Sequence, residues 1–591
     1  MAVSMRSHFL FAGVFSFTAS YLGAALLLVL SAANEWAADV PKPGATAGIK
    51  DFDLQEFISK AIQSGAKQVV VPAGRYRVTP NGAHHLFFKD LADVEILADG
   101  VEMICTQTVQ AIGFDNCRDV HVRGLTVDYD PLPFTEGRIT ALAPDKSWVE
   151  FEIIAGYPET SLEERVEIYD PQTRELRRET GGWSKEFRPA GNHRYRVTKH
   201  TGYHFNPSVD TEQVGDILVT NNAFPAKAGG HAIALTQCTG VKLEDITLYA
   251  APTFGFLEDR CDGNTYLRCK IDRRAPQDDP VKRALPRMRS LDADAFHSIG
   301  AAKGPAILDC TAKFQGDDCV NIHGVYHFVT GSNGSRLRVA AIGRMTIEPG
   351  DPVEFLPYSG ERPADAVAVK IEPDAGITAE EKAFIQKLSL NDRNKRRLLA
   401  GEATFYAVTL DRAVPLAMGS AMCSGRRVGN GFVVKGCDFG YNRSRGILIK
   451  ASHGEVSGNK ITNGWMAAVL VAPEFWWFEA ASASDVTIKD NVIIGCRRPA
   501  IEVIAPGGNG QPLPSGAHRD LRISGNTFTQ SVWPNIHVTS TSGLLLSNNH
   551  LTPFDPVNFV PPLESRWIWR TGQPSAVVTE FCEQPPPGAN R

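Results

Sequence analysis

Two acidic segments, residues 292–297 and 316–324, contain the residues whose types and spacing could do chemistry. From Asp294 to Asp317 the separation is 317 − 294 = 23 residues, which fits one coil of a stacked β-solenoid. Adjacent coils lie roughly 5 Å apart in backbone, so the carboxyl groups of Asp294, Asp317 and Asp318 would meet on one surface patch. Such a cluster suits hydrolysis, and glycoside hydrolysis in particular, which needs one protonated and one ionised carboxyl group.

The adjacent pair Asp317 and Asp318 requires a bend in the chain, because neighbouring residues of a strand point to opposite faces. A corner or bulge at Gly316 would turn both side chains outward. Three carboxyl groups this close cannot all ionise cheaply, so one pKa must rise, and the raised pKa supplies an acid. The alternative is a structural or calcium-binding cluster. Calcium would suit a lyase with an arginine base, and nothing in the sequence marks that arginine. We expect neither a metal nor an organic cofactor.

Asn recurs at corners in the C-terminal third of the chain. Asn459, Asn491, Asn526 and Asn549 are separated by 32, 35 and 23 residues (491 − 459, 526 − 491 and 549 − 526), among short β-branched runs. Asn suits such corners because it tolerates the left-handed backbone region and because its amide can bond along a stack. One unit repeated with loops of varying length predicts an all-β solenoid. A sandwich or a propeller would not produce this rhythm.

Coils are predicted over residues 45–130, 221–328 and 428–555. Two stretches, 131–220 and 329–427, break the rhythm and indicate β-rich insertions. They contain similar phrases, Gly-Asp-Ile-Leu-Val from Gly215 and Gly-Asp-Pro-Val-Glu-Phe from Gly350, which favour small barrels of one kind. Insertions that emerge from one face of a solenoid commonly shape its binding cleft.

The N-terminus combines Arg6 with an apolar stretch from Phe9 to Ala33 that ends in small residues. This pattern predicts a signal peptide over residues 1–33 and a secreted or periplasmic protein. An uncleaved membrane anchor is the alternative, because the apolar run is long enough to span a bilayer. No stable membrane span is expected after cleavage. Residues 556–591 are interpreted as a C-terminal tail.

Composition restricts the partners. The net charge of −5 and the pI near 6.3 argue against nucleic acid and favour a neutral or weakly charged substrate. The eleven cysteines lack metal-type spacing, so most are expected to be small buried thiols. A disulfide is open to an exported protein, and Cys261–Cys269 is the best local candidate. A homodimer is left open.

The segment 294–324 resembles the central motif of glycoside hydrolase family 110, as do the later run 442–450 and the segment 474–479. The resemblance extends over roughly residues 50–555, and its specific part is the region 290–480. It implies a right-handed parallel β-helix with small barrel insertions and exo-acting, inverting α-1,3-galactosidase activity. The implied partner is an oligosaccharide or polysaccharide with terminal α-galactose. By the same analogy, Asp317 would be the general acid, and Asp294 and Asp318 would hold the nucleophilic water.

Further residues are candidates for substrate binding because they accompany the acidic cluster or follow it by one or two coils. They are His297, Asn321, His323, Arg443, Arg445, Trp476, Trp477 and Glu479. Each type has an alternative role: the histidines could orient a carboxylate, Asn321 could bond along the stack, the arginines could pair with carboxylates, and the tryptophans could cap the coil. An indole pair on a loop is well suited to stacking on a sugar face.

Two other functions remain open. Gly316–Cys319 reads Gly-Asp-Asp-Cys, a motif of family 28 polygalacturonases, so a polygalacturonase-like enzyme or another β-helix glycosidase is the first alternative. That family usually has Asn-Thr-Asp where this chain has Asp292-Ala-Asp294, which favours family 110. A non-catalytic carbohydrate-binding solenoid is the second alternative. The acidic triad argues against it, because binding alone does not require clustered carboxylates.

Overall fold

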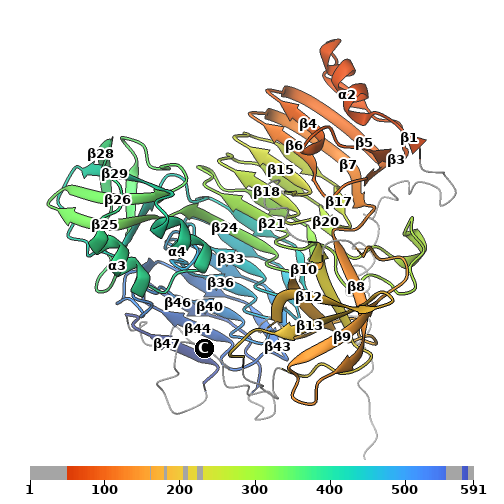
Figure 1. Cartoon of the computed structure of the whole chain (residues 1–591). Helices are drawn as coiled ribbons and strands as arrows, with labels where there is room; N and C mark the ends of the chain where they lie inside the picture. The colour runs from red at the N-terminus through yellow and green to blue at the C-terminus, as the bar shows by residue number, and fades with distance from the viewer. Residues whose placement is uncertain are drawn as a thin grey trace, which may run out of the picture.

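The computed structural model describes residues 50–159, 162–178, 183–203, 210–222, 230–553 and 575–583. The predicted signal peptide and most of the predicted tail lie outside the described residues. Within them, the chain forms a parallel β-helix that runs the length of the molecule (Figure 1). The predicted all-β solenoid is therefore confirmed. No helix of the described part of the chain is long and apolar enough to cross a membrane.

One wall of the coils is a 12-stranded sheet within the described residues. All neighbours along its main path are parallel, and only the short β37 pairs antiparallel, with β24. Its strands are β4 (His84–Lys89), β6 (Gln110–Asp115), β15 (Ile233–Thr236), β18 (Phe256–Asp259), β21 (Phe296–Ile299), β24 (Val320–Val325), β33 (Ile447–Ile449), β36 (Val469–Val471), β37 (Glu479–Ala480), β40 (Ile501–Val503), β44 (Ile536–Thr539) and β47 (Val577–Glu580).

The remaining walls form a 20-stranded parallel network among the described residues. Its strands are β1 (Lys50–Asp51), β2 (Gln68–Val70), β3 (Gly74–Val78), β5 (Ala92–Cys105), β7 (Arg118–Tyr129), β16 (Lys242–Glu244), β17 (Thr247–Leu248), β19 (Thr265–Leu267), β20 (Lys270–Ile271), β22 (Ala306–Leu308), β23 (Thr311–Lys313), β31 (Val433–Lys435), β32 (Asp438–Gly440), β34 (Glu455–Ser457), β35 (Lys460–Thr462), β38 (Thr487–Lys489), β39 (Val492–Ile494), β42 (Arg522–Ser524), β43 (Thr527–Thr529) and β46 (Leu545–Ser547). A two-stranded pair, β41 (His518–Arg519) with β45 (Thr541–Ser542), and a short 3₁₀ turn at Pro276–Asp278 complete the coils.

A row of buried apolar residues runs inside the coils. The middle residue of each short strand points inward, and paired middle residues stack from coil to coil, as in Leu243, Tyr266, Ile307, Val434, Val456, Ile488, Ile523 and Leu546. Each of these is at most 2% exposed. Three-residue strands with one inward side chain explain the short β-branched runs of the sequence, because every coil must fill the same narrow core.

The predicted Asn stack is present. The Asn491 amide donates to Asn526 Oδ1 at 2.9 Å, and Asn526 donates in the same way to Asn549. The left-handed residue of each corner is not the Asn, however. It is the residue before it, for example Gly458 and Gly525, with φ of 63° and 66°. The Asn is selected for its amide, which bonds the coils on either side.

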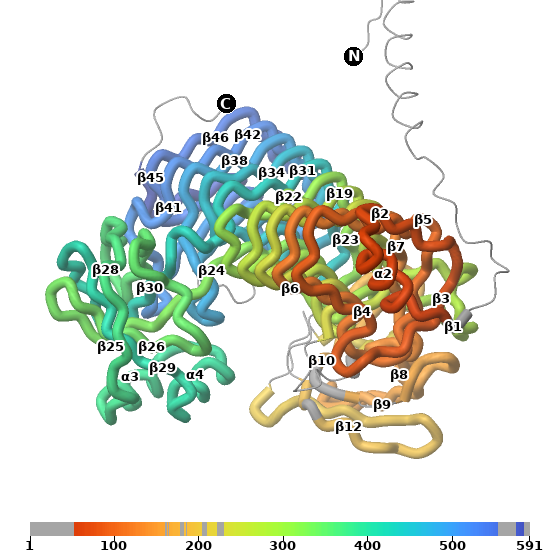
Figure 2. The backbone as a smooth tube through the Cα atoms, turned by 90° about the horizontal axis from the view of Figure 1, so that it is seen from above, coloured from red at the N-terminus to blue at the C-terminus, as the bar shows by residue number. Residues whose placement is uncertain are grey.

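The two interruptions fold as separate β units. The first is a seven-stranded antiparallel sheet of β8 (Phe134–Leu142), β9 (Trp148–Ile153), β10 (Leu162–Tyr169), β11 (Leu176–Arg178), β12 (Trp183–Gly191), β13 (Arg194–Lys199) and β14 (Ile217–Asn222). The second is a closed barrel of β25 (His327–Asn333), β26 (Arg336–Ile342), β27 (Pro352–Leu356), β28 (Ala366–Pro373), β29 (Ala403–Leu410) and β30 (Ala421–Ser424), with helices α3 (Ala379–Lys387) and α4 (Asp392–Leu399). Figure 2 shows both units on the same side of the coils.

The ends of the coils and the cysteines complete the fold. Helix α2 (Leu54–Gln63) covers the N-terminal end with Leu54 and Ile58 in the core. At the other end β47, which lies in the stretch interpreted as a tail, pairs with β44 and extends the sheet. All eleven cysteines are free. The suggested Cys261–Cys269 disulfide is wrong, because each thiol instead bonds to a carbonyl of the preceding coil.

Candidate active site

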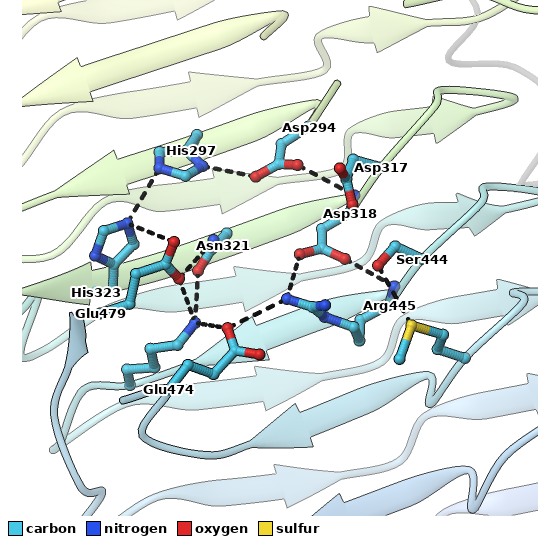
Figure 3. A network of polar contacts seen from close by, with 12 residues as sticks. Asp294, His297, Asp317, Asp318, Asn321, His323, Ser444, Arg445, Glu474 and Glu479 are labelled. Carbon is cyan, nitrogen blue, oxygen red and sulfur yellow. Dashed lines mark hydrogen bonds and ion pairs between the residues drawn. The ribbon is translucent and has the colours of Figure 1, made fainter. Parts of the chain in front are cut away.

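The acidic residues lie at the N-terminal ends of three neighbouring parallel strands, β21, β24 and β33. One row of buried residues crosses these strands: Phe296, Val320 and Ile447. Two residues before each member of the row lie Asp294, Asp318 and Arg445. These three positions are therefore equivalent on successive coils. The 23-residue spacing correctly predicted that Asp294 and the Asp317–Asp318 pair would meet (Figure 3).

Oxygen atoms of Asp294, Asp317 and Asp318 lie within 4.8 Å of one another. The Asp318 backbone N–H donates to Asp294 Oδ1 at 3.3 Å, which joins the two coils at this point. The three side chains differ in access to solvent. The Asp317 side chain is 23% exposed, whereas those of Asp294 and Asp318 are 6% and 3% exposed. Of the three, Asp317 is thus the carboxyl that a bound molecule can reach most easily.

Gly316 forms the corner that separates the two adjacent aspartates. A Cβ atom at this position would lie 2.7 Å from Asp292 O, so only glycine allows the two coils to approach so closely. After the corner, Asp317 turns toward Arg443, and Asp318 turns toward Arg445. The bend that the pair requires is therefore present.

Asp317 is held by two guanidinium groups. Arg443 lies 2.8 Å and Arg165 lies 3.3 Å from Asp317 Oδ2. Burial raises the pKa of Asp317, but Arg443, Arg165 and Arg445 outweigh burial, and the pKa lies below its usual value. In the free protein Asp317 is therefore ionised at neutral pH.

The pKa values of Asp318 and Asp294 are raised, in contrast to that of Asp317. Burial raises the pKa of Asp318 well above its usual value, although Arg445 lies 3.0 Å from Oδ2 and its backbone N–H donates to Oδ1 at 2.8 Å. Burial also raises the pKa of Asp294, and the hydrogen bond from His297 opposes part of that rise. The cluster therefore keeps its exchangeable proton on the side of these two buried carboxyls.

Two histidines fix the orientation of Asp294. His297 Nδ1 lies 2.6 Å from Asp294 Oδ2, and His297 Nε2 lies 3.1 Å from His323 Nε2. Burial lowers the pKa of His323 to about 4, so this ring is neutral. Its Nδ1–H donates to Gly324 O at 2.6 Å, which leaves His323 Nε2 to accept a hydrogen bond from His297 Nε2–H. His297 also stacks on Phe254, with ring centroids 4.2 Å apart.

Lys450 lies on the other side of the site, and its side chain is fully buried. Its ammonium lies 3.0 Å from Glu474 and 2.8 Å from Glu479, and it donates to Asn321 Oδ1 at 3.1 Å. Burial raises the pKa of Glu479, but the charge and hydrogen bond of the Lys450 ammonium oppose burial, and this pKa lies well below its usual value. Glu479 is thus an ionised, nearly buried carboxylate.

The contacts form a closed ring of side chains, in which the Asp318 backbone N–H supplies the link to Asp294 (Figure 3). Arg445 continues from Asp318 to Glu474 at 3.3 Å, and Glu479 lies 3.9 Å from His323. The ring therefore runs through Asp294, His297, His323, Glu479, Lys450, Glu474, Arg445 and Asp318. Charges of both signs alternate along much of it, which fixes each carboxylate before any ligand binds.

Glu474 and Glu479 belong to a hairpin turn whose tip is clamped by the barrel unit. The Asn391 amide donates to Trp476 O at 2.5 Å, and the Asn394 amide donates to Trp477 O at 3.0 Å. The indole side chains remain 39% and 51% exposed. The barrel unit thus supports the turn that brings two glutamates into the ring.

Comparisons with known proteins identify similar chains. Residues 417–551 match the family model described as a right handed beta helix region. Alpha-1,3-galactosidase A of Bacteroides fragilis is 23% identical over 548 residues, which cover 84% of this chain and 83% of that protein. Alpha-1,3-galactosidase B of Bacteroides thetaiotaomicron is 24% identical over 580 residues, which cover 86% and 87%. The predicted resemblance to glycoside hydrolase family 110 is confirmed. The chain is a glycoside hydrolase.

The solved structures that match this glycoside hydrolase share little sequence with it. The A-module of the mannuronan C-5 epimerase AlgE4 of Azotobacter vinelandii is 10% identical, covers 92% of this chain and 96% of its own, and gives a TM-score of 0.38. The catalytic domain of a GH87 alpha-1,3-glucanase is 9% identical, covers 88% and 67%, and gives a TM-score of 0.35. TM-scores this low support no inference about the activity of this chain.

The glycoside hydrolase brings most of the predicted site residues together. Arg443 and Arg445 bind the carboxylates of Asp317 and Asp318, which favours their pairing role over direct contact with a sugar. His297 orients a carboxylate, as the alternative for that residue held. The tryptophans lie on the hairpin turn that carries Glu474 and Glu479.

Sequence reasoning missed three members of the site. Lys450 and Glu474 lay in segments that carry the family resemblance, but nothing marked their side chains as facing the cluster. Arg165 comes from the first inserted sheet, 152 residues before Asp317. Only the docking of that sheet on the coils brings it to the site.

The three aspartates could also be imagined as a cation site, because their oxygens lie close enough together. Calcium takes roughly six to eight oxygen ligands, whereas here Arg165, Arg443 and Arg445 already supply positive charge to the cluster. The donor set therefore fits an arginine-balanced carboxyl cluster better than a metal centre, and we do not assign these residues as ligands.

Proposed function

We propose that this glycoside hydrolase is an exported, exo-acting enzyme that releases terminal α-1,3-linked galactose with inversion. The observation that carries the proposal is the cluster of Asp294, Asp317 and Asp318 on two successive coils, with Asp317 partly exposed and the other two buried. The relatives that match over more than four-fifths of this chain are named alpha-1,3-galactosidases, which supports the linkage and the sugar.

The general acid is assigned to Asp317. The pKa order of the free protein favours Asp318 as the protonated group, whereas exposure favours Asp317 as the group that can touch a glycosidic oxygen. An acid must lie within hydrogen-bond reach of the leaving oxygen. We therefore assign the acid by exposure, which selects Asp317 over Asp318. The three carboxyls are close enough to share a proton. Substrate that covers Asp317 would remove water from it and favour its protonated form.

Asp294 and Asp318 would then hold the nucleophilic water as bases. Inversion is proposed from the family resemblance, because the distance between the carboxyl groups does not by itself favour an inverting mechanism. Inverting enzymes typically separate their carboxyl groups by about 6.5–9.5 Å, whereas the oxygens here lie within 4.8 Å. The stereochemistry of the product is accordingly the most informative single measurement.

A neutral sugar fits the site better than an acidic one. A polygalacturonase-like enzyme needs cations that face the substrate carboxylate. The side chains of Arg443, Arg445 and Lys450 are instead engaged by carboxylates of the protein. Galactose would find carboxylate acceptors in the ring and the Asn321 amide beside Lys450, and the exposed indoles of Trp476 and Trp477 offer faces for stacking.

Proton NMR of the purified protein acting on an α-1,3-linked galactobioside tests the proposal. β-Galactose as the first product supports inversion, and α-galactose would show retention. An oligogalacturonide in a parallel sample gives the polygalacturonase-like alternative its own positive result. Asp317→Asn should abolish turnover while substrate still binds. If the wild type turns over neither substrate, the proposed sugar specificity fails and other α-linked sugars are tested next.

Export has a separate test. It rests on the N-terminal apolar segment, which lies outside the described residues. N-terminal sequencing of protein recovered from the periplasm or medium should find the first residue near position 34. Full-length protein in the membrane fraction would instead establish the anchor.

A further inference from the structure

Strand β10 of the first inserted sheet presents alternate side chains to the coils. Glu167 and Tyr169 are both buried on this face, and Arg165 has the same alternation. The pairing of β10 with β14 shifts register between Glu163 and Val166, so Arg165 lies in an irregular part of the strand. Such irregularities re-aim a side chain, and here the guanidinium reaches the acidic cluster.

The Arg165 guanidinium joins the two coils that carry the aspartates. Its Nη1 donates to Asp292 O at 2.6 Å and to Gly316 O at 2.8 Å, and its Nη2 donates to Asp317 Oδ2 at 3.3 Å. Asp292 precedes Asp294 by two residues, and Gly316 precedes Asp317 by one. A single side chain from outside the coils therefore fixes both corners.

Arg443 approaches the same atoms from the coil side. Its Nε donates to Gly316 O at 2.5 Å, and its Nη2 donates to Asp317 Oδ2 at 2.8 Å. Asp317 Oδ2 thus accepts hydrogen bonds from two guanidinium groups that come from different parts of the chain. If the Arg165 side chain is removed, Asp317 loses one of these two hydrogen bonds, and its carboxylate gains freedom to rotate.

A buried ion-pair network fixes β10 in place. Glu167 is fully buried and lies 2.6 Å from Arg289, which in turn lies 2.7 Å from Asp292 Oδ1. The network bonds the strand to the same corner that Arg165 contacts. Arg165 is therefore pre-organised by its strand rather than by a substrate.

We propose that Arg165 is a positioning residue for Asp317, so that the first inserted sheet is a working part of the active site. This inference rests on the proposed hydrolase function in naming Asp317 as the acid. Arg165 holds the direction of the carboxyl group, and its charge favours the ionised form before substrate binds. The charged groups that face Asp317 are Arg165, Arg443, Arg445, Asp294 and Asp318, with Glu167 behind the two arginines.

The test compares Arg165→Met, Arg165→Lys and the control Arg196→Met. Arg196 lies on β13 of the same sheet and pairs with Glu150, away from the coils. Three quantities are measured for each variant: kcat and KM on the galactobioside, the pH profile of kcat/KM, and the titration of the Asp317 carboxyl by ¹³C NMR. The carboxyl signal is assigned by its loss in Asp317→Asn, and its titration needs no substrate.

Arg165→Met should lower kcat about 10- to 100-fold with little change in KM, because small displacements of a catalytic group have effects of that size. Loss of the positive charge should raise the pKa of Asp317. Because the acid must be protonated, the alkaline limb of the profile moves to higher pH. Arg165→Lys keeps the positive charge but loses the planar guanidinium that donates to three acceptors at once. It should therefore lower kcat and leave the alkaline limb of the pH profile in place.

Unchanged kcat and an unchanged Asp317 titration in Arg165→Met would overturn the inference, as would an equal loss in Arg196→Met. If Arg165→Met does not fold, Arg165→Lys decides: reduced kcat at wild-type thermal stability supports positioning, and wild-type kcat rejects it. If the wild type hydrolyses no α-1,3-galactoside, the proposed function fails. The carboxyl titration then still tests whether Arg165 acts on Asp317.

Discussion

The Lys450 ammonium lies 2.8 Å from Glu479 Oε2, and the lysine side chain has no exposed surface. The same ammonium also lies 3.0 Å from Glu474. One buried cation thus balances two carboxylates that come from a single hairpin turn. Since a buried charge is costly unless it is paired, each of these groups depends on the others.

Lys450→Met should destabilise the protein by about 3–5 kcal/mol, because it leaves carboxylates without their buried partner. Urea unfolding followed by circular dichroism measures the change. Lys489→Met is the matched control, since Lys489 pairs with Glu455 at 3.2 Å on an exposed face. That exposed pair should contribute at most about 1 kcal/mol. Equal effects of the two substitutions would contradict the importance assigned to Lys450.

His297→Phe should move the acidic limb of kcat/KM to higher pH. The hydrogen bond from His297 lowers the raised pKa of Asp294, and phenylalanine keeps the stacking on Phe254 but removes that bond. Asp294 must be ionised to act as a base. A further rise in its pKa therefore removes activity at the low end of the pH range.

The control for this profile is His121→Phe, because His121 pairs with Glu95 and Glu244 on the outer face of the coils, away from the site. It should leave both limbs in place. An acidic limb that stays unchanged in His297→Phe would separate Asp294 from the base role.

The sequence was sufficient to predict the coil and the aspartates, because both follow from the length of one repeat. Asp294 and Asp318 are separated by 318 − 294 = 24 residues, which is one coil of this solenoid, so coiling alone brings them side by side. Lys450 could not be assigned in this way. All three residues of β33 are buried, so alternation of polarity does not reveal that the residue after that strand faces the ring.

Contacts that depend on docking are also beyond the local pattern. Arg165 and Asn391 belong to the inserted units, and their partners lie 152 and 85 residues away in the chain. Which strand or helix of an insertion faces the coils is decided by packing and buried ion pairs. The spacing of polar residues within an insertion does not encode it.

Asn391→Asp should raise KM with little loss of stability. Asn391 caps helix α4 by accepting from the Asn394 backbone N–H, and its amide donates to Trp476 O. Aspartate caps a helix as well as asparagine does, but it cannot donate to the carbonyl. The turn that carries Glu474 and Glu479 should loosen. Kinetics on the galactobioside and thermal unfolding measure the two effects separately.

Thr378→Ala is the matched control, because it removes a helix cap that makes no described hydrogen bond to the hairpin turn. Thr378 caps α3 through Glu381 and makes no described contact with the hairpin turn. Its loss should reduce stability by about 1 kcal/mol and leave KM unchanged. If Asn391→Asp also leaves KM unchanged, the clamp has no part in substrate binding.

Asn491→Ala should destabilise the coils by at least about 3 kcal/mol, because several buried groups lose hydrogen bonds at once. Asn491 is fully buried. Its amide donates to Val456 O and Asn526 Oδ1, and its Oδ1 accepts from the backbone and the amide of Asn459. The matched variant is Asn549→Ala at the partly exposed end of the stack, where the amide donates only to Ile523 O and Oδ1 accepts from Asn526. Urea unfolding should therefore give a clearly smaller loss for Asn549→Ala. Equal losses would show that the stack does not act as a cooperative ladder, and that the Asn rhythm serves only the local corner.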